Sequence, residues 1–218
     1  MLEMISLASS SRGNCHALLC DTSWVVLDVG MNPLDVARKA GRRLNCCAAA
    51  LVTHEHRDHA NYADAWTRMG VPVPELWTGH LYDLGWEWQV AAAEVPHDVP
   101  CNALLVRAPT RESVAYITDC AFSPVRFASV THWLVEANYD EEILLKAKES
   151  GEIDTAQYER VRRSHMSIRT CVDMLRSNDL SKTREIRLVH LSRRHADQEK
   201  FRDLVQRATG KLVTVAEE

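Results

Sequence analysis

The stretch Thr53-His54-Glu55-His56-Arg57-Asp58-His59 places three imidazoles and a carboxylate within six positions. Small apolar residues at 48–52 precede it and predict a buried strand, and apolar residues at helical spacing follow it from Ala60 to Met69. We expect the stretch to form a loop between strand and helix, because a helix would turn its side chains to different faces. Imidazole nitrogens and carboxylate oxygens are the usual ligands of zinc and similar divalent metals.

Four such residues exceed what one metal needs if it must also keep a position open for water, so two metals are the simpler interpretation. The alternative is a polar surface loop that is rich in histidine by chance. Other ligand-type residues argue against that alternative because they recur where predicted strands end. These are His97 after the strand at 86–95, Asp119 after the strand at 113–118, and His190 after the strand at 186–189.

The composition is that of an ordinary globular protein, with 218 residues, 46% hydrophobic and 26% charged. We expect one domain over residues 1–218. The net charge of −4 does not indicate a bulk nucleic-acid binder. Seven cysteines without a C-x-x-C pair predict free thiols in a reducing cytosol. No leader and no apolar run of roughly 20 residues is present, so we expect a cytoplasmic protein without membrane contact.

The order of predicted elements indicates the fold class. Strands come first in hairpins and then alternate with helices, which predicts an α/β protein with two sheets covered by helices. Beyond the elements above, we predict strands at 4–8, 15–20, 24–29, 103–106, 133–135 and 212–215, a turn at Ser9–Asn14, and helices at 34–43, 140–149, 168–177 and 197–208. We also predict an edge strand at 71–77, a short helix or turn at 80–85, and a partly helical, exposed segment at 150–164.

Four motifs, T-H-E-H-R-D-H, P-H-D, I-T-D and V-H-L-S, stand in an order that resembles the metallo-β-lactamase superfamily over nearly the whole chain. The resemblance implies a four-layer αββα sandwich with two divalent metal ions, most simply zinc, although manganese or iron would fit the same ligands. Two such ions would lower the pKa of a water between them and provide hydroxide near neutral pH. The implied ligands are His54, His56 and His97 for one ion, Asp58, His59 and His190 for the other, and Asp119 between them.

Further motifs resemble the phosphodiesterase branch of this superfamily. Glu136-Ala137-Asn138, Ser164-His165-Met166-Ser167 and the H-x-S-x-R run from His190 are similar to motifs of RNase Z. The Ser-Ser-x-Gly-Asn turn from Ser10 to Asn14 is similar to that of the nuclease-like YycJ branch. The resemblance implies that His165 protonates the leaving oxygen and that Glu136 orients it. With Asp58 and Asp119, these are the expected catalytic residues.

Several of these residues also have a structural interpretation. His165 could instead cap the helix that begins near Ile168. Asp28, at the end of its strand, could be a turn carboxylate or a partner for a ligand imidazole.

Candidate substrate-binding residues lie near both ends of the chain. Ser10, Ser11 and Asn14 could present donors at the mouth of the site, and the alternative is a plain turn. Arg193 and Arg194 follow a ligand histidine and could clamp a phosphate. The C-terminal third is enriched in arginine, which indicates a nucleic-acid track or, more commonly, a solvated face with only some members near the site. Those arginines are Arg160, Arg162, Arg163, Arg169, Arg184 and Arg187.

The sequence also departs from its relatives. Tyr139, Cys120-Ala121 and His195-Ala196-Asp197 replace residues that the YycJ branch commonly carries. No segment resembles the tRNA-gripping arm of RNase Z, so tRNA 3′ processing is not expected.

We therefore predict a metal-dependent phosphodiesterase, an exonuclease-like nuclease acting on nucleic acid. Small or cyclic nucleotides are an alternative substrate. A thiolester or lactone hydrolase would use the same metals without needing His165, and a non-enzymatic binding protein is a further alternative. The resemblance is also compatible with a homodimer.

Overall fold

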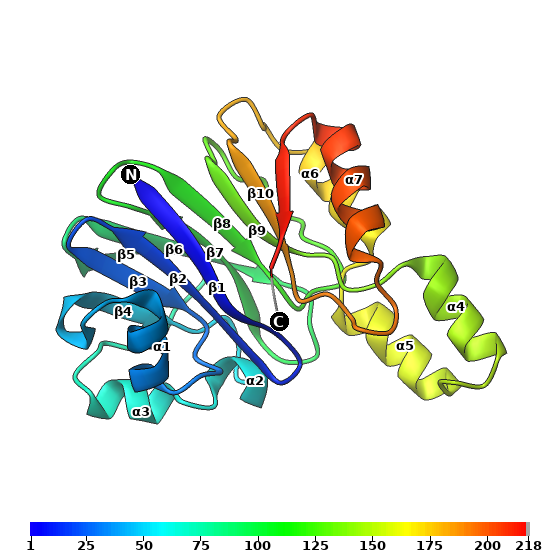
Figure 1. Ribbon diagram of the computed structural model, residues 1–218, viewed down its shortest axis with the longest axis horizontal. Coiled ribbons are helices and arrows are strands. Elements are labelled where there is room, and N and C mark those ends of the chain that lie inside the picture. Colours follow the sequence, from blue (N-terminus) through cyan, green and yellow to red (C-terminus); the bar gives the residue numbers. More distant parts are fainter. Residues whose placement is uncertain (217–218) are drawn as a thin grey trace.

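The computed structural model describes residues 1–216 as two β-sheets that face each other, with helices on both outer sides (Figure 1). The four-stranded sheet has the order β1-β2-β3-β4, in which β3 and β4 are parallel and the other pairs are antiparallel. Its strands are β1 (Leu2–Ser10), β2 (Gly13–Cys20), β3 (Ser23–Leu27) and β4 (Cys47–Leu51).

The seven-stranded sheet has the order β11-β10-β9-β8-β7-β6-β5. The strands β8 to β11 are parallel to one another, and β5 to β8 pair antiparallel. The strands are β5 (Leu81–Gly85), β6 (Trp88–Val95), β7 (Cys101–Arg107), β8 (Ser113–Ile117), β9 (His132–Glu136), β10 (Glu185–Val189) and β11 (Leu212–Val215).

The helices lie in two groups. α1 (Pro33–Ala40), α2 (Arg57–Ala60) and α3 (Ala63–Arg68) belong to the side of the four-stranded sheet, with a 3₁₀ turn at Leu44–Cys46. α6 (Ile168–Arg176) and α7 (Gln198–Thr209) cover the seven-stranded sheet near β9 and β10. α4 (Glu141–Glu149) and α5 (Thr155–Ser164) project from that side and pack on each other (Figure 1).

Three apolar layers hold the sandwich together. Leu27 and Trp88 lie in the layer between the sheets. Trp24 and Trp66 lie between the four-stranded sheet and its helices, and Phe201 lies between the other sheet and α7. β2, β3, β4, β8 and β9 are buried along their whole lengths. Accordingly, β3, β4 and β8 are almost entirely apolar in sequence. The predicted four-layer αββα sandwich is confirmed.

Two elements predicted for the segment 71–85 are wrong. Residues 71–77 form no strand, since Pro72 and Pro74 lack the N–H groups that a ladder needs. Residues 81–85, predicted as a helix or turn, form the edge strand β5. Its hairpin with β6 turns at Trp86-Glu87, where both residues have positive φ without the usual Asn-Gly signal.

The prediction for 53–69 also needs correction. The histidine stretch is a loop only as far as His56, because α2 begins at Arg57 and carries Asp58 and His59 on one helical turn. The following helix is shorter than expected and begins at Ala63. The turn between β1 and β2 is tighter than the predicted Ser9–Asn14, because the strands pair as far as Ser10 and Gly13.

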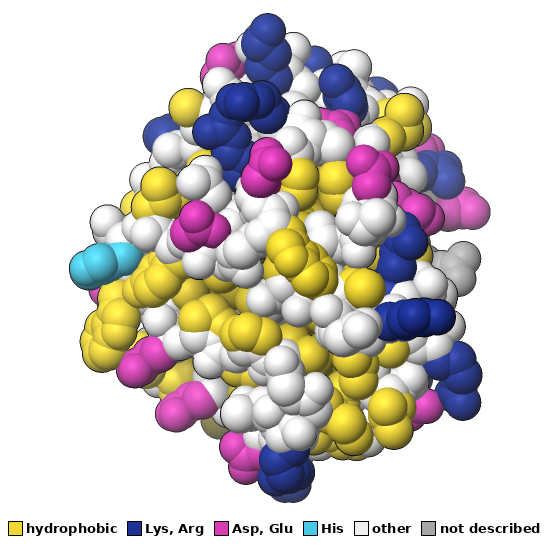
Figure 2. All heavy atoms as spheres, turned by 90° about the vertical axis from the view of Figure 1, so that its left-hand side faces the viewer, with side chains coloured by type: hydrophobic (Ala, Val, Ile, Leu, Met, Phe, Trp, Pro, Cys, Tyr) yellow, Lys and Arg dark blue, Asp and Glu magenta, His cyan; other side chains and the backbone are white. Residues whose placement is uncertain are grey.

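The surface of the described residues has one notable apolar region. Apolar side chains gather on the face that lies to the left in Figure 1 (Figure 2). Trp77, Leu81 and Trp86, in and around β5, are at least half exposed. All seven cysteines are unpaired, as predicted. Within residues 1–216, no helix has the length and apolar character that crossing a bilayer requires.

Candidate metal centre

Ligand-type side chains from six strand ends gather at one end of the two sheets. β3 and β4 are parallel, and so are β8, β9 and β10, so their carboxyl ends meet at the same edge. The residues delivered there are Asp28 after β3, His54 and His56 after β4, His97 after β6, Asp119 after β8, Glu136 at the end of β9 and His190 after β10.

Three of these residues adopt a left-handed backbone conformation that could not be predicted from the sequence. Asp28, Asp119 and His190 have φ of 59°, 50° and 53°, each directly or one residue after a strand. A left-handed conformation in a non-glycine residue costs about 1–3 kcal/mol and persists where the surroundings determine it. Here it turns the chain sharply, so that the side chain points across the end of the sheet.

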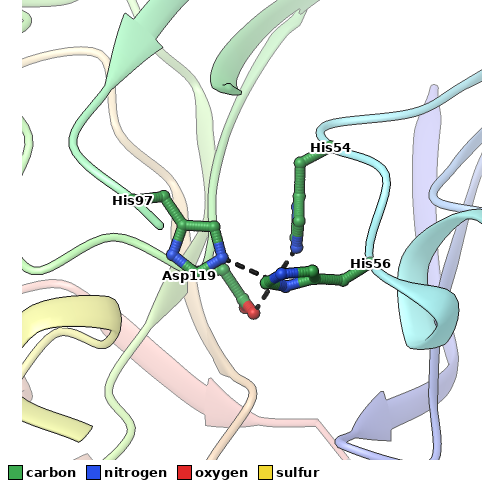
Figure 3. Close-up of side chains that lie close together, drawn as sticks. All are labelled: His54, His56, His97 and Asp119. Atoms are coloured by element: carbon green, nitrogen blue, oxygen red, sulfur yellow. Dashed lines mark hydrogen bonds and ion pairs between the residues drawn. The ribbon is translucent and has the colours of Figure 1, made fainter. Parts of the chain in front are cut away.

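The first ligand group consists of His54, His56, His97 and Asp119, and their four ligand atoms lie within 4.8 Å of one another (Figure 3). His56 Nδ1 lies 3.2 Å from His97 Nε2, and His54 Nε2 lies 3.8 Å from Asp119 Oδ2. Ligands at 2.0–2.1 Å from one tetrahedral zinc ion are about 3.3 Å apart. The spacing of these atoms therefore fits a shared metal.

The second group consists of Asp58, His59, His190 and Asp119, also within 4.8 Å. His59 Nε2 lies 3.4 Å from Asp58 Oδ2 and 3.4 Å from Asp119 Oδ2, and His190 Nε2 lies 3.7 Å from Asp58 Oδ2. Because Asp119 Oδ2 is near ligand nitrogens of both groups, it occupies a bridging position. The structure thus brings together all seven residues that the sequence assigned to metal binding.

Buried nitrogens without partners support this fit. His54 Nε2 and His190 Nε2 have no hydrogen-bond partner within residues 1–216, and burial of such an atom is costly unless it is ligated. Burial lowers the pKa of His54 to about 4, so this imidazole is neutral and ready to bind a metal at pH 7. The donor set of imidazoles and carboxylates suits zinc, and also manganese.

The electrostatics of the second group favour a cation. Burial alone would lower the pKa of His190, but Asp119, Asp58 and Glu136 outweigh it and raise the pKa to about 10. Burial opposes ionisation of Asp119 as well, yet His190 and His59 hold its pKa well below the usual range. The carboxylates thus attract a positive charge to this point, which a metal ion can supply in place of the protons.

Asp28 fixes the orientation of the ligands from below. It accepts hydrogen bonds from the Thr53 N–H, at 2.9 Å, and from the Tyr116 hydroxyl, at 2.7 Å, and it lies 2.6 Å from His59 Nδ1. Thr53 Oγ1 in turn lies 3.0 Å from His54 Nδ1. These contacts leave Nε2 of both histidines for the metal. Of the two interpretations of Asp28, the structure supports the partner of a ligand imidazole.

Comparison with known proteins shows similarity in structure alone, because no protein-family model and no curated protein matches the sequence. The solved structure of YhfI from Bacillus subtilis, described as a metallo-beta-lactamase fold protein, superposes with a TM-score of 0.73 at 10% identity, over 99% of this chain and 96% of that chain. A diphosphatase of the PhnP family gives 0.67 at 12% identity, over 100% and 96%. The short form of human tRNase Z gives 0.60 at 14% identity, over 99% and 96%.

The chain adopts the metallo-β-lactamase fold. This confirms the fold that the four sequence motifs indicated, over the whole length of the chain. Since one fold hosts many reactions, the chemistry has to be argued from the residues around the centre.

A pair of residues beside the metallo-β-lactamase-fold centre is arranged to handle a proton. His165 Nδ1 lies 2.7 Å from Glu136 Oε1, and Glu136 Oε2 accepts the backbone N–H groups of Cys120 and Met166. Burial of Glu136 would raise its pKa, but His165 and the hydrogen bond with His190 outweigh this and lower it, so the carboxylate stays ionised. Ser167, not His165, caps α6 by accepting the N–H of Thr170, which excludes the capping role considered for His165.

Two connected hollows open beside the centre. The inner cleft has a volume of about 160 Å³, and the outer cleft a volume of about 540 Å³; they share Ser11, Arg160, His165 and His190. The inner cleft is also lined by His56, Asp58, His97, Asp98, Asp119 and Ser164. The outer cleft is also lined by Ser10, Arg12, Asn138, Gln157, Val161, Leu191, Ser192, Arg193, Arg194 and His195.

Most of the predicted substrate-binding residues line the outer cleft, but Asn14 does not. Asn14 is buried, and its amide donates to Asp58 Oδ2 at 3.2 Å and lies 2.9 Å from His59 Nε2. Its place in a strand beneath α2, rather than in an open turn, puts it under the ligands instead of at the mouth. The expectation for Asn14 is therefore corrected to a role in positioning the ligands.

The arginines predicted to form a nucleic-acid track do not all lie near the clefts in the structure. Arg160 lines both clefts, whereas Arg184 pairs with Glu112 and Arg187 pairs with Glu185. Sequence reasoning did not select Thr53, Tyr116, Arg12 or Asp98, which also surround the centre. Thr53, Arg12 and Asp98 had a signal, since each lies within or beside a motif quoted above. Tyr116 had none, because its partner Asp28 is distant in sequence.

Proposed function

We propose that this protein is a metal-dependent phosphodiesterase that acts on nucleic acid or nucleotides. The observation that carries the proposal is the pair formed by His165 and Glu136, which stands beside both ligand groups. A phosphodiester releases an alkoxide, which leaves poorly without a proton donor. A thiolester or a strained lactam has a better leaving group and needs such a donor much less.

The contacts of His165 fit a general acid. Glu136 holds Nδ1, and the side chain lines both clefts, so Nε2 is the nitrogen available to a substrate. The ring stacks on His190, with the centroids 5.2 Å apart and the planes at 28°. Glu136 fixes the orientation of the imidazole, so that Nε2 can present a proton to the leaving oxygen.

The metals would be held by the two groups described above, with zinc as the first expectation and manganese as the second. When bound, such ions supply a nucleophile from water at neutral pH and neutralise charge that develops on the phosphate. The third cluster of ligand-type residues, Asp119, Glu136, His165 and His190, shares two members with the second group. Since Glu136 already accepts two backbone N–H groups, we assign this cluster to proton transfer rather than to a third ion.

The solved structures agree with this proposal without testing it. A diphosphatase and a tRNase Z share the fold, and both names describe cleavage of phosphate bonds. The arginines of the outer cleft add donors suited to phosphate oxygens.

The test compares wild type, Asp119→Ala and His165→Ala on two phosphodiesters, with zinc or manganese present. One is bis-p-nitrophenyl phosphate, whose leaving group needs little acid help, and the other is the unactivated dinucleotide TpT. We expect Asp119→Ala to abolish both activities, and His165→Ala to lower kcat on TpT about 10²–10⁴-fold with a much smaller effect on the activated ester. His80→Ala, an exposed histidine outside both clefts, is the control. Hydrolysis of a thiolester by a wild type that cleaves neither phosphodiester would contradict the proposal.

A further inference from the structure

The two clefts differ sharply in charge. The inner cleft is lined by three aspartates and suits cations, whereas the outer cleft is lined by four arginines and by no acidic residue. The chain as a whole carries a net charge of −4, so this concentration of positive charge is local. An arginine-lined hollow beside a metal centre recruits a ligand with negative charge beyond the group that the metals hold.

Three of these arginines are available to a ligand. Within residues 1–216, Arg12, Arg160 and Arg194 make no ion pair with a carboxylate, unlike Arg184 and Arg187 on the same protein. They come from three separate elements: the turn between β1 and β2, the helix α5, and the loop after β10. Guanidinium groups that converge from separate elements can grip one phosphate from several sides.

His195 provides an independent sign of a ligand in the outer cleft. It is 5% exposed, lines the cleft, and its Nε2 has no hydrogen-bond partner within the described residues. The Ser192 hydroxyl, which accepts the backbone N–H of His195 at 3.2 Å, lies 3.3 Å from Nδ1 and can donate to it. The ring proton then stays on Nε2, which is left as a buried donor without an acceptor. A buried donor of this kind is rarely left unsatisfied.

We infer that the outer cleft binds the leaving part of the substrate and that this part carries a phosphate of its own. The inference rests on the function proposed above. His165 lies at the junction of the two clefts and protonates the leaving oxygen, so the leaving group extends away from the metal ligands into the outer cleft. The volume of about 540 Å³ lies in the range of pockets for ligands of nucleotide size.

This assignment selects among the substrates considered for the chain. A strand of nucleic acid or a phosphorylated dinucleotide has a second phosphate next to the leaving nucleoside. A cyclic nucleotide does not, because its leaving oxygen stays on the same sugar and no second phosphate is present. The substrate class is therefore a linear, phosphorylated nucleotide chain.

The kinetic test compares three dinucleotides that differ only in a terminal phosphate: TpT, pTpT and TpTp. Whichever side leaves, one of the two phosphorylated forms carries the extra phosphate on it. We expect that form to be cleaved with a kcat/KM at least tenfold higher than TpT. The double variant Arg160→Gln with Arg194→Gln should reduce this preference to less than threefold. Arg163→Gln, one turn along the same helix but outside both clefts, should keep it.

A binding measurement on the metal-loaded protein separates this inference from the proposed function. Thymidine 3′,5′-bisphosphate should bind wild type at least tenfold more tightly than either thymidine monophosphate, and the double variant should lose that advantage. Cleavage of TpT with no preference for a phosphorylated form, and equal binding of mono- and bisphosphate, would overturn the inference while the proposed function stands. Loss of bisphosphate binding in the double variant, with no dinucleotide cleaved by wild type, would contradict the proposed function and support the phosphate site.

Discussion

Asp28 is a buried side chain that orients residues of the candidate metal centre without belonging to either ligand group. Its carboxylate is fully buried and receives donors from Thr53, His59 and Tyr116. Burial would raise the pKa of Asp28, but the neighbouring His59 and the hydrogen bonds outweigh this and lower the pKa. The carboxylate is therefore ionised and directs Nε2 of His59 toward the ligand group.

Replacing this carboxylate by an amide tests that role. In Asp28→Asn one oxygen becomes an NH₂ group, which accepts no hydrogen bond. The single remaining oxygen cannot serve both the Thr53 N–H on one side and His59 with Tyr116 on the other. We expect metal affinity to fall about 10–100-fold, the usual effect of losing such a partner, as measured by competition with a chromogenic chelator. Asp35→Asn, at an exposed surface ion pair, is the matched control and should bind metal like wild type. Equal affinity in Asp28→Asn would refute the positioning role.

At the scale of elements, close backbone contacts hold the loops that carry the ligands. Gly30, between β3 and α1, is the tightest of them. A Cβ atom built there would lie 2.1 Å from the Asp58 carbonyl oxygen and 2.6 Å from the Asn14 nitrogen. Both are backbone atoms and cannot rotate away, so only glycine lets α2 approach β2 this closely.

The variant Gly30→Ala should therefore push α2 outward. We expect a loss of about 3 kcal/mol in the free energy of unfolding, at the upper end for overpacking, together with weaker metal binding. Urea denaturation and metal titration measure the two effects. Gly210→Ala, at the open C-terminal cap of α7, should cost about 1 kcal/mol and leave metal binding intact. A Gly30→Ala protein with wild-type stability would show that the loops can separate freely.

Asp140 connects two elements near the outer cleft. It caps α4 by accepting the N–H of Glu142 at 2.8 Å, and it accepts from Lys200 Nζ of α7 at 2.7 Å. Burial opposes its ionisation, but Lys200 and the cap donors lower its pKa below the usual 3.8. Its contribution to stability is therefore present above about pH 4 and is lost as the pH falls through the lowered pKa.

We expect Asp140→Ala to reduce the free energy of unfolding by about 1 kcal/mol at pH 7, and by less as the pH falls below 4. Asp140→Asn keeps a good cap and should lose only the ion pair with Lys200, which is half exposed and worth a few tenths of a kcal/mol. Urea denaturation of all three proteins between pH 3 and pH 7 measures this. A constant difference between Asp140→Ala and wild type over that range would contradict the assignment.

At the scale of the whole molecule, the residues of the candidate metal centre come from both sheets. β3 and β4 of one sheet and β6, β8 and β10 of the other all end in its ligands or their partners. Binding to the folded state alone stabilises it by RT ln(1 + [L]/Kd), or about 2.7 kcal/mol at a hundredfold excess over Kd. Metal ions should therefore stabilise both halves of the sandwich together.

We expect zinc or manganese to raise the midpoint of thermal unfolding and a chelator to lower it, in a single transition. Asp119→Ala, which lacks the bridging carboxylate, should respond much less to either treatment, and Asp203→Ala, an exposed aspartate of α7, should respond like wild type. Scanning calorimetry with and without chelator measures both. If neither metal nor chelator changed the unfolding midpoint of the wild type, this would contradict metal binding at the candidate centre.

The sequence by itself determined the class of fold and predicted which residues gather as candidate metal ligands. Most strands and helices could be placed from the sequence, because apolar runs and helical spacing reflect local burial. The candidate ligands could be chosen because H-x-H-x-D-H, His97, Asp119 and His190 are residue types that bind metals. The elements that were missed, β5 and α2, depend on a hairpin turn at Trp86-Glu87 and on a single helical turn. Neither leaves a periodic pattern long enough to detect.

Only the tertiary structure decided how these residues meet. Several contacts involve partners that are far apart in the chain. Asn14 is buried beneath Asp58, and Asp28 contacts Tyr116. Arg184 pairs with Glu112, whereas Arg160 makes no such pair within residues 1–216. The left-handed turns at Asp119 and His190 and the contrast between an acidic inner and a basic outer cleft arise in the same way. The physical reason is that local sequence sets backbone preference and burial, whereas the partner of a polar side chain is set by which strands pack together.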